Sequence, residues 1–345
     1  MRSLQGRRHR GAGARAGTRI SRAGAAALFA LALAACSSTG GKPVDTGGSG
    51  GSGGGVNTPR VTIAMVTHGP PGDTFWDLIR KGAEDAARKD NIDLKYSSDR
   101  EGPNQANLVQ NAVDSKVAGV AVTLAQPDAM KDAVKGAVAA GIPVVALNAG
   151  IEQWQDLGIL EYFGQDERIS GEAAGKRVAA DGSKKAICVV QEQGSVSLEA
   201  RCAGVKAGMG GGSVENLNVN GTDMPSVEST ITAKLQQDPG IDYIVTLGAP
   251  IALSAVQSVK NTGNKAKVAT FDTNAALVTA IRDGSVQWAI DQQPYLQGYL
   301  AIDSLWLYIN NKNVIGGGKP TLTGPSFIDK SNIDSVAALA QAGTR

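Results

Sequence analysis

From residue 60 onward, short apolar runs rich in β-branched residues alternate with longer stretches in which apolar residues recur every three or four positions. The short runs predict buried β-strands, and the spacing of three, four and seven predicts amphipathic helices. The first helical stripe follows a predicted strand at residues 61–65 and consists of Phe75, Leu78, Ile79, Ala83 and Ala86. Thr74, with Asp77 three residues later, is the expected N-cap of that helix.

The same alternation continues along the chain and predicts nine strands. They lie at residues 61–65, 92–96, 119–124, 142–147, 185–190, 214–219, 241–247, 267–271 and 286–290. Further helices are expected near residues 104–115, 128–140, 167–180, 197–206, 227–237, 251–261, 275–282 and 297–309. The run at 142–147 is almost entirely apolar, which is typical of a strand covered on both faces in a parallel sheet.

This alternation predicts an α/β fold with parallel sheets. Nine strands exceed a typical single sheet, and the length of the chain suits two domains. The pattern also restarts after the fourth strand. We therefore expect two doubly wound parallel-sheet lobes. A (βα)₈ barrel is the alternative, and it would need eight units in one closed sheet.

The first 35 residues have the pattern of an export signal. Seven arginines precede an apolar run at residues 25–35, which is too short to span a bilayer as a helix. The run ends in Leu33-Ala34-Ala35-Cys36, which resembles a bacterial lipobox and implies cleavage before Cys36 and lipid attachment to its sulfur. An ordinary signal peptide with an incidental cysteine is the alternative. Residues 36–59 form a Gly/Ser-rich tether, which predicts a flexible coil.

The charge of the chain changes when the signal is removed. The whole sequence has 34 basic and 32 acidic residues. Without the seven arginines of the signal, 27 basic residues stand against 32 acidic ones, a net charge of −5. Binding to nucleic acid requires a basic face, so we expect no nucleic-acid partner.

Two cysteines remain if Cys36 carries lipid. In an oxidising exported compartment, Cys188 and Cys202 are expected to form a structural disulfide, with two buried thiols as the alternative. Two thiols and a single histidine in the expected mature chain, His68, argue against a zinc site. No phosphate- or dinucleotide-binding motif follows a predicted strand, so no metal or cofactor is expected.

Polar residues follow the predicted strands at their carboxyl ends, where open α/β sheets bind ligands. This set comprises Thr67 to Asp73, Gln126, Asn148, Gln191, Glu192, the turn at 248–250, Asp272 and Gln292. Amide and carboxylate groups can bridge adjacent hydroxyls of a polyol. Each of these residues could instead cap a helix or bond to a loop.

Phe75 and Trp76 are neighbours in the first helix. Adjacent helical positions point about 100° apart, so both cannot share one narrow core stripe. One of them is expected to face the cleft, where an aromatic ring can lie against the C–H face of a sugar.

Catalysis is not expected, because one histidine and no cysteine–histidine pair leave few general-base or nucleophile arrangements.

Four motifs give the domain a family resemblance. They are the Thr-Phe-Trp loop at 74–76, Gly-Ile-Pro-Val-Val at 141–145, Thr-Phe-Asp at 270–272 and Ile-Asp-Gln-Gln-Pro at 290–294. In order and spacing, residues 60–334 resemble the periplasmic sugar-binding proteins of the ribose/galactose-binding type, which share a two-lobed fold with LacI-type regulators. No helix-turn-helix precedes residue 60, so we do not expect a regulator.

The resemblance implies roles for individual residues. Phe75 and Trp76 match the aromatic pair that sandwiches the sugar ring. Asp73, Asn148, Arg201, Asp272 and Gln292 match polar contacts to the ring or its hydroxyls. The chain departs from the pattern at Ala149, where arginine is common, and at Gly248-Ala249, where an asparagine–aspartate pair is expected. Its first loop, His68 to Gly72, is also longer. These departures argue against D-ribose and leave a furanose, an acyclic polyol, or a sugar met by Glu192 and Gln165.

The resemblance also implies the architecture and the role. The lobes are expected at residues 60–164 with 293–322 and at 165–292 with 323–345, with crossings near Gly164, Gln292 and Thr323. A sugar or polyol would bind between them and favour the closed form. We expect a monomer, anchored by lipid to the outer face of the cell membrane, that serves the permease of an ABC importer. A sensor that feeds a chemoreceptor or kinase, or an exported sugar-acting enzyme, is the alternative.

Overall fold

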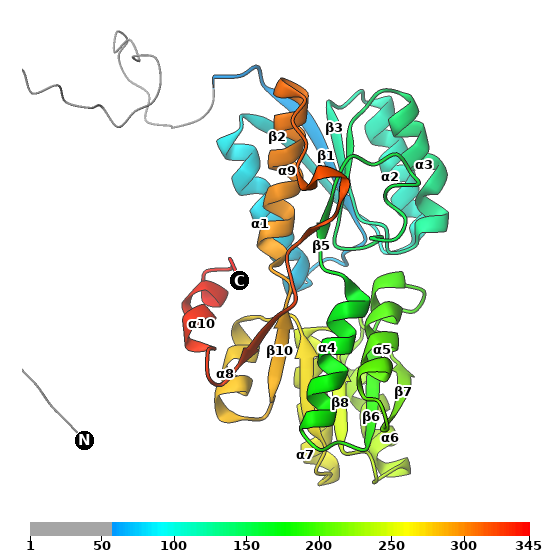
Figure 1. Cartoon of the computed structure of the whole chain (residues 1–345), viewed down its shortest axis with the longest axis vertical. Coiled ribbons are helices and arrows are strands. Elements are labelled where there is room, and N and C mark those ends of the chain that lie inside the picture. Colours follow the sequence, from blue (N-terminus) through cyan, green and yellow to red (C-terminus); the bar gives the residue numbers. More distant parts are fainter. Residues whose placement is uncertain (1–56) are drawn as a thin grey trace, which may run out of the picture. The chain divides into compact units, whose positions relative to one another are not determined.

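The computed structural model describes residues 57–345 and contains two six-stranded sheets (Figure 1). The first sheet has the order β11-β5-β4-β3-β1-β2 and is parallel throughout. Its strands are β1 (Val61–Thr67), β2 (Ile92–Ser98), β3 (Gly119–Val122), β4 (Val144–Leu147), β5 (Tyr162–Gly164) and β11 (Thr321–Leu322). The predicted signal, the lipidation site Cys36 and nearly all of the tether lie outside the described residues.

The second sheet has the order β12-β10-β9-β8-β6-β7 and is parallel except for β12, which pairs antiparallel with β10. Its strands are β6 (Lys185–Val190), β7 (Ser213–Asn218), β8 (Tyr243–Thr246), β9 (Lys267–Phe271), β10 (Trp288–Asp291) and β12 (Ser326–Asp329). The prediction of an α/β fold with two parallel-sheet lobes is therefore confirmed.

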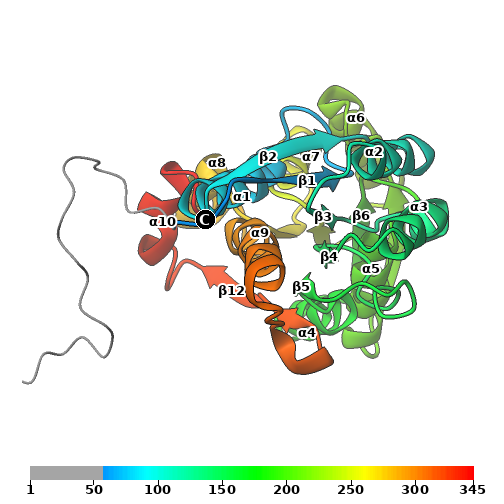
Figure 2. The same ribbon diagram turned by 90° about the horizontal axis from the view of Figure 1, so that it is seen from above.

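Helices cover both faces of each sheet. The first sheet is covered by α1 (Thr74–Lys89), α2 (Gly102–Asp114), α3 (Pro127–Ala139) and α9 (Pro294–Asn311). Helices α1 and α9 lie side by side on one face of this sheet, and α2 and α3 cover the other (Figures 1 and 2). We call this sheet with its helices the first lobe.

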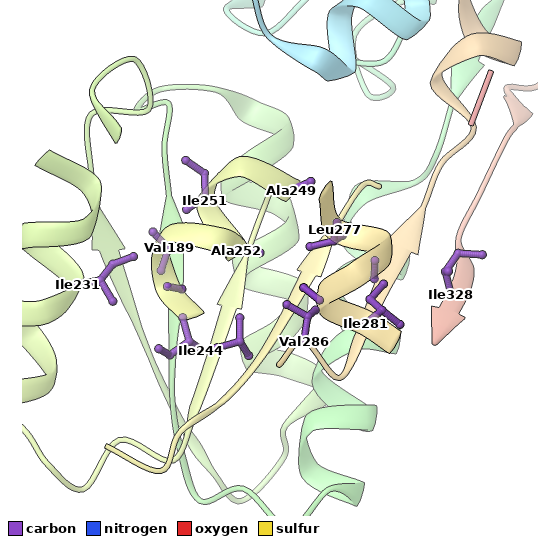
Figure 3. Packing of buried hydrophobic residues seen from close by; sticks show 14 of the residues in the cluster. Val189, Ile231, Ile244, Ala249, Ile251, Ala252, Leu277, Ile281, Val286 and Ile328 are labelled. Carbon is purple, nitrogen blue, oxygen red and sulfur yellow. The ribbon is translucent and has the colours of Figure 1, made fainter. Parts of the chain in front are cut away.

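The second sheet and its helices form the second lobe. Its helices are α4 (Glu167–Ala180), α5 (Val196–Gly208), α6 (Met224–Gln237), α7 (Ala249–Thr262), α8 (Ala275–Asp283) and α10 (Asp334–Gln341). Helices α4 and α5 bury one face of the sheet, and the apolar cluster drawn in Figure 3 fills the other. Burial on both faces explains why the inner strands β3, β4, β6 and β8 are nearly all apolar, whereas the edge strands β2 and β7 carry many polar residues. No helix among residues 57–345 has the length and apolar character needed to cross a bilayer.

Three strands and one helix differ from the sequence prediction. The nine predicted strands are all present with ends shifted by up to two residues, but β5, β11 and β12 and helix α10 were not predicted. Strands β5 and β11 have three and two residues, which is too short for a periodic pattern. The expected N-cap Thr74 is also wrong. Asp73 is the N-cap of α1, and its Oδ1 accepts a hydrogen bond from the backbone N–H of Phe75 at 2.9 Å.

The chain passes between the two sheets three times, after β5, after β10 and between β11 and β12. These connections are hydrogen-bonded to one another. The backbone N–H of Thr323 donates to the carbonyl of Gly164 at 2.7 Å, and Gln293 Nε2 donates to the carbonyl of Thr323 at 2.8 Å. The three connections therefore form one bonded strip between the lobes.

The predicted disulfide joins Cys188 in β6 to Cys202 in α5. Both cysteines are buried in the apolar cluster beneath α4 and α5. The bond ties α5 directly to β6, which lies between β8 and the edge strand β7 in the second sheet.

Helices α4 and α5 cross at four glycines. A Cβ added at Gly171 would lie 2.2 Å from the carbonyl oxygen of Arg201, and one at Gly204 would lie 2.4 Å from that of Arg168. Gly175 and Gly208 make equally close contacts one turn further along. Only a residue without a side chain permits this backbone approach.

We expect Gly171→Ala to lower the free energy of unfolding by about 2 kcal/mol, because the added methyl group overpacks the α4–α5 contact. Urea unfolding followed by circular dichroism measures the change. Gly136→Ala is the matched control. It lies in the exposed part of α3 with no atom within 4 Å of the new Cβ, so alanine there should be neutral or stabilising. Equal effects of the two substitutions would contradict the packing argument.

Candidate functional site

A cavity of about 300 Å³ lies where the carboxyl ends of the strands of both lobes meet. The first lobe contributes the loop from His68 to Trp76, Arg100 and Asn148, and the connection after β10 contributes Gln292. The second lobe contributes the residues after β6, β8 and β9, including Glu192, Leu247–Ile251 and Asp272. This volume is at the lower end of the range for small-molecule sites.

Eight of the nine ligand-binding residues predicted from the sequence line this cavity. They are Asp73, Phe75, Trp76, Asn148, Glu192, Arg201, Asp272 and Gln292. Gln126 does not. It lies in a neighbouring groove, where its Oε1 accepts from the backbone N–H of Gly102 at 3.3 Å and its Nε2 donates to the carbonyl of Arg100 at 3.4 Å. The reason is that β3 ends at Val122, so Gln126 is the N-cap of α3.

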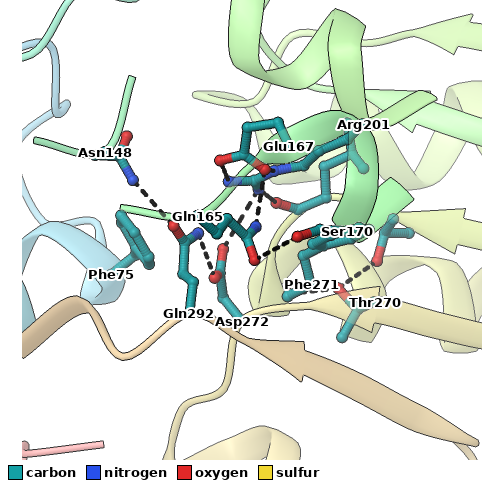
Figure 4. A network of polar contacts seen from close by, with 12 residues as sticks. Phe75, Asn148, Gln165, Glu167, Ser170, Arg201, Thr270, Phe271, Asp272 and Gln292 are labelled. Atoms are coloured by element: carbon teal, nitrogen blue, oxygen red, sulfur yellow. Dashed lines mark hydrogen bonds and ion pairs between the residues drawn. The ribbon is translucent and has the colours of Figure 1, made fainter. Parts of the chain in front are cut away.

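The centre of the site is a buried arginine. Arg201 on α5 is 3% exposed, and its Nε and Nη2 donate to the two carboxylate oxygens of Glu167 on α4 at 2.5 and 2.8 Å (Figure 4). Burial opposes the charge of the guanidinium, but the Glu167 carboxylate raises the pKa of Arg201 above its usual value. Gln165 Nε2 donates to Glu167 at 2.8 Å. Bidentate pairing fixes the position of the guanidinium.

A chain of polar contacts connects the two lobes through Gln292. Its Nε2 donates to Asp272 Oδ1 at 2.8 Å, and its Oε1 accepts from Asn148 Nδ2 at 3.3 Å (Figure 4). Asp272 Oδ2 also lies 3.9 Å from Arg201 Nη1. Asn148 and Asp272 directly follow β4 and β9, and both have positive φ, 65° and 64°. Asparagine and aspartate tolerate this backbone region better than other side chains do.

Two acidic groups in the cavity have strongly shifted pKa values. Burial raises the pKa of Asp272 to about 7, although Arg201 and Gln292 act in the opposite direction. Burial likewise raises the pKa of Glu192 to about 7, against the attraction of Arg100. Glu192 Oε1 is buried and has no hydrogen-bond partner among residues 57–345. Both groups are therefore placed to bond to a ligand that enters the cavity.

Arg100 bridges the lobes and was not predicted from the sequence. Its Nη2 donates to the carbonyl of Gln191 at 2.9 Å, from the loop after β2 to the loop after β6. The predicted strand ended at residue 96, but β2 continues to Ser98. With the correct end, Arg100 would have been found among the residues that directly follow a strand. Ser195, Ser197 and Thr222 also line the cavity and were missed.

The two aromatic residues have different roles, but Trp76 takes the core position that the predicted apolar stripe assigned to Phe75. Trp76 is buried and packs on the loop, since a Cβ at Gly69 would lie 2.3 Å from its Cγ. Phe75 is half-buried, contacts Trp76 edge to face, and lies on the side of Asn148 and Gln292 (Figure 4). Phe75 therefore adds an aromatic face to the apolar part of the cavity lining, which also includes Leu198 and Ile251.

The raised pKa of Asp272 predicts a pH dependence of stability. A carboxyl group titrates near pH 4 in the unfolded chain, so between about pH 4 and pH 7 the folded protein holds the extra proton. The Asp272 carboxyl group therefore lowers the free energy of unfolding as the pH rises through this range, by up to about 1.4 kcal/mol per pH unit. Asp272→Asn should make this slope less negative in urea unfolding at several pH values. Glu152→Gln, at an exposed glutamate, should leave the slope unchanged. A slope that is the same in Asp272→Asn and wild type would refute the assignment.

Comparison with known proteins agrees with this geometry. The sequence model of the periplasmic binding protein domain matches residues 63–313. The chain is 27% identical over 294 residues to the xylose/arabinose-binding protein of Sulfolobus acidocaldarius, a match that covers 79% of this chain and 71% of that protein. It is 23% identical over 252 residues to the ribose import binding protein of Bacillus subtilis, a match that covers 70% of this chain and 79% of that protein.

Solved structures show the same fold. A carbohydrate transporter from Acidothermus cellulolyticus 11B, in complex with myo-inositol, is 57% identical with a TM-score of 0.82, and the match covers 83% of this chain and 100% of that one. A solute-binding protein from Burkholderia graminis in complex with D-arabinose is 23% identical with a TM-score of 0.72, and the match covers 80% of this chain and 97% of that one. With the family model matching most of its length, this chain belongs to the periplasmic binding protein domain family.

Proposed function

We propose that this chain is the solute-binding protein of an ABC importer and that it captures myo-inositol or a closely related polyhydroxylated ring. The observation that carries the proposal is the cavity itself, in which acidic, amide and guanidinium groups of both lobes converge beside apolar side chains that include the ring of Phe75. The 57% identical protein with bound myo-inositol supports the choice of ligand. Binding without turnover is the proposed role.

The polar groups of the cavity suit a ring that carries many hydroxyls. Asp272 and Glu192 offer carboxyl oxygens, Asn148 and Gln292 offer amides, and Arg201 offers guanidinium donors. A hydroxyl both donates and accepts, so it can satisfy either kind of neighbour. Phe75 can cover the C–H face of the ring, where hydroxyls make no contact. Gly248 and Ala249 line the cavity without a polar side chain, so the cavity differs from the ribose pattern at this turn.

Ligand binding between the lobes is proposed to favour their closure. A ligand in this cavity contacts both lobes only when they are close, so it stabilises the closed form. The hinge would be the bonded strip formed by Gly164, Gln293 and Thr323. We propose lobe boundaries of 60–164 with 293–322 and 165–292 with 323–345. The closed pair of lobes is the form that a permease would distinguish from the open one.

Export and anchoring complete the proposal. Cleavage before Cys36 and lipid attachment to its sulfur would hold a monomer at the outer face of the cell membrane, with residues 37–59 as the tether. The resemblance of Leu33-Ala34-Ala35-Cys36 to a lipobox supports this step.

Isothermal titration calorimetry with myo-inositol tests the function. Phe75→Ala and Asp272→Ala should each weaken binding by about 2 kcal/mol, or roughly thirtyfold, because each removes a buried contact to the ligand. Gln126→Ala should change the affinity less than about twofold, because its side chain lies outside the cavity. A thermal-shift screen of pentoses, hexoses and inositols on the wild type ranks the alternatives. No heat with any of these compounds would contradict the proposed function.

Small-angle scattering tests closure. Saturation with myo-inositol should reduce the radius of gyration of the wild type, since the ligand favours the form in which both lobes contact it. The same addition should leave Asp272→Ala unchanged at a concentration that saturates only the wild type. An unchanged radius in the saturated wild type would rule out closure as the response to ligand.

A further inference from the structure

His68 is a buried residue of the cavity that has no assigned role in the proposed function. It directly follows β1, is 5% exposed and lines the cavity beside Trp76, whose ring it meets edge to face at 4.5 Å between centroids. It is also the only histidine among the described residues. A buried imidazole has two chemically different nitrogens, so its hydrogen-bond partners decide what it offers to a ligand.

The partner of one nitrogen is Thr123, at the end of β3. The Oγ1 of Thr123 lies 2.6 Å from His68 Nδ1. The same oxygen accepts from the backbone N–H of His68 at 3.1 Å and from Gln105 Nε2 at 3.1 Å. Gln105 Nε2 also faces the carbonyls of Thr123 and Val66, at 2.9 and 3.4 Å, so that end of the amide is the NH₂ group.

These contacts fix the direction of the bond between Thr123 and His68. Thr123 is fully buried, and its hydroxyl hydrogen needs an acceptor. Two of the three partners of Oγ1 are N–H donors and cannot accept it. Among residues 57–345, His68 Nδ1 is the only acceptor bonded to this hydroxyl. Thr123 therefore donates to Nδ1, and the ring proton of a neutral His68 is on Nε2.

The electrostatic surroundings keep the ring neutral. Burial lowers the pKa of His68 to about 3, and the positive charges of Arg100 and Arg201 act in the same direction. The Nε2–H group is on the side of the ring away from Thr123, and no described residue forms a hydrogen bond with it. It is a neutral donor that has no hydrogen-bond partner within residues 57–345.

We propose that His68 is a specificity-determining residue whose Nε2–H donates to a hydroxyl oxygen of the ligand, and that Thr123 and Gln105 position it by fixing the tautomer. The proposal deepens the proposed function and rests on it for the identity of the ligand. Arg201 and Arg100 would also attract an anionic oxygen, whereas a neutral donor in a cavity that Asp272 and Glu192 also line suits an uncharged hydroxyl. The carboxyl groups then accept from the other hydroxyls of the same ring.

The tautomer can be measured without ligand. The full chain carrying His9→Gln has a single histidine, so ¹⁵N-labelled histidine gives one pair of ring nitrogens in two-bond ¹H–¹⁵N spectra. We expect Nε2 to carry the proton and Nδ1 to be unprotonated, and we expect the signals of both nitrogens to stay unchanged between about pH 5 and pH 8. Thr123→Ser should keep this pattern, and Thr123→Val should lose it. A proton on Nδ1, or titration within that range, would overturn the proposal.

The binding role is tested by a matched pair of substitutions. The terminal amide nitrogen of glutamine reaches the position of Nε2, and that of asparagine reaches only the position of Nδ1. With myo-inositol as the probe, His68→Asn should weaken binding by about tenfold to a hundredfold, and His68→Gln by less than about threefold. Saturating myo-inositol should also shift the Nε2–H signal of the wild type. Melting temperatures report whether both variants are folded.

The outcomes separate this inference from the proposed function. Equal losses in the two variants, or an Nε2–H signal that does not move, would overturn the role of His68 while the ligand assignment stands. If the wild type gives no heat with myo-inositol, the ligand assignment fails. The ligand-free spectra then still decide the tautomer.

Discussion

The site depends on one interaction, the burial of the Arg201 charge against Glu167. Removing a guanidinium from water costs several kcal/mol unless its donors are satisfied, so an arginine at 3% exposure requires a fixed carboxylate beside it. Glu167 is at the first turn of α4 and Arg201 is in the middle of α5. They can meet because the glycines of the two helices let the backbones touch, and the Cys188–Cys202 bond holds α5 on the sheet.

The remaining polar groups are arranged around this pair. Burial raises the pKa of Asp272 to about 7 and outweighs the nearby charge of Arg201, which acts to lower it. Gln292 connects Asp272 to Asn148 of the first lobe. The second lobe therefore supplies most of the charge, and the first lobe supplies the aromatic wall and the neutral donor His68. A ligand that bonds to both sets of groups couples the lobes.

Much of the fold and of the site was predictable because parallel strands leave a strong local signal. A continuous apolar run identifies a strand covered on both faces, and the residues after it fall at the ligand-binding edge, which located Asn148, Glu192, Asp272 and Gln292. Where a strand end was misplaced, the site residue was missed, as with Arg100 after β2, or wrongly included, as with Gln126 after β3. The proposed role of His68 depends on its bond to Thr123, 55 residues away along the chain, and on the bond of Gln105 to the same hydroxyl, which no local pattern reveals.

The glycine crossing of α4 and α5 also bears on how such a protein can diversify. A side chain at any of the four glycines would separate the helices and pull Glu167 away from Arg201. Relatives that take other solutes are therefore expected to retain small residues there and to vary the loop from His68 to Phe75, whose side chains are free of that constraint. Selection for a new ligand would act on the loops that line the cavity, such as His68 to Phe75 and the turn at 248–250, while the Glu167–Arg201 pair is preserved.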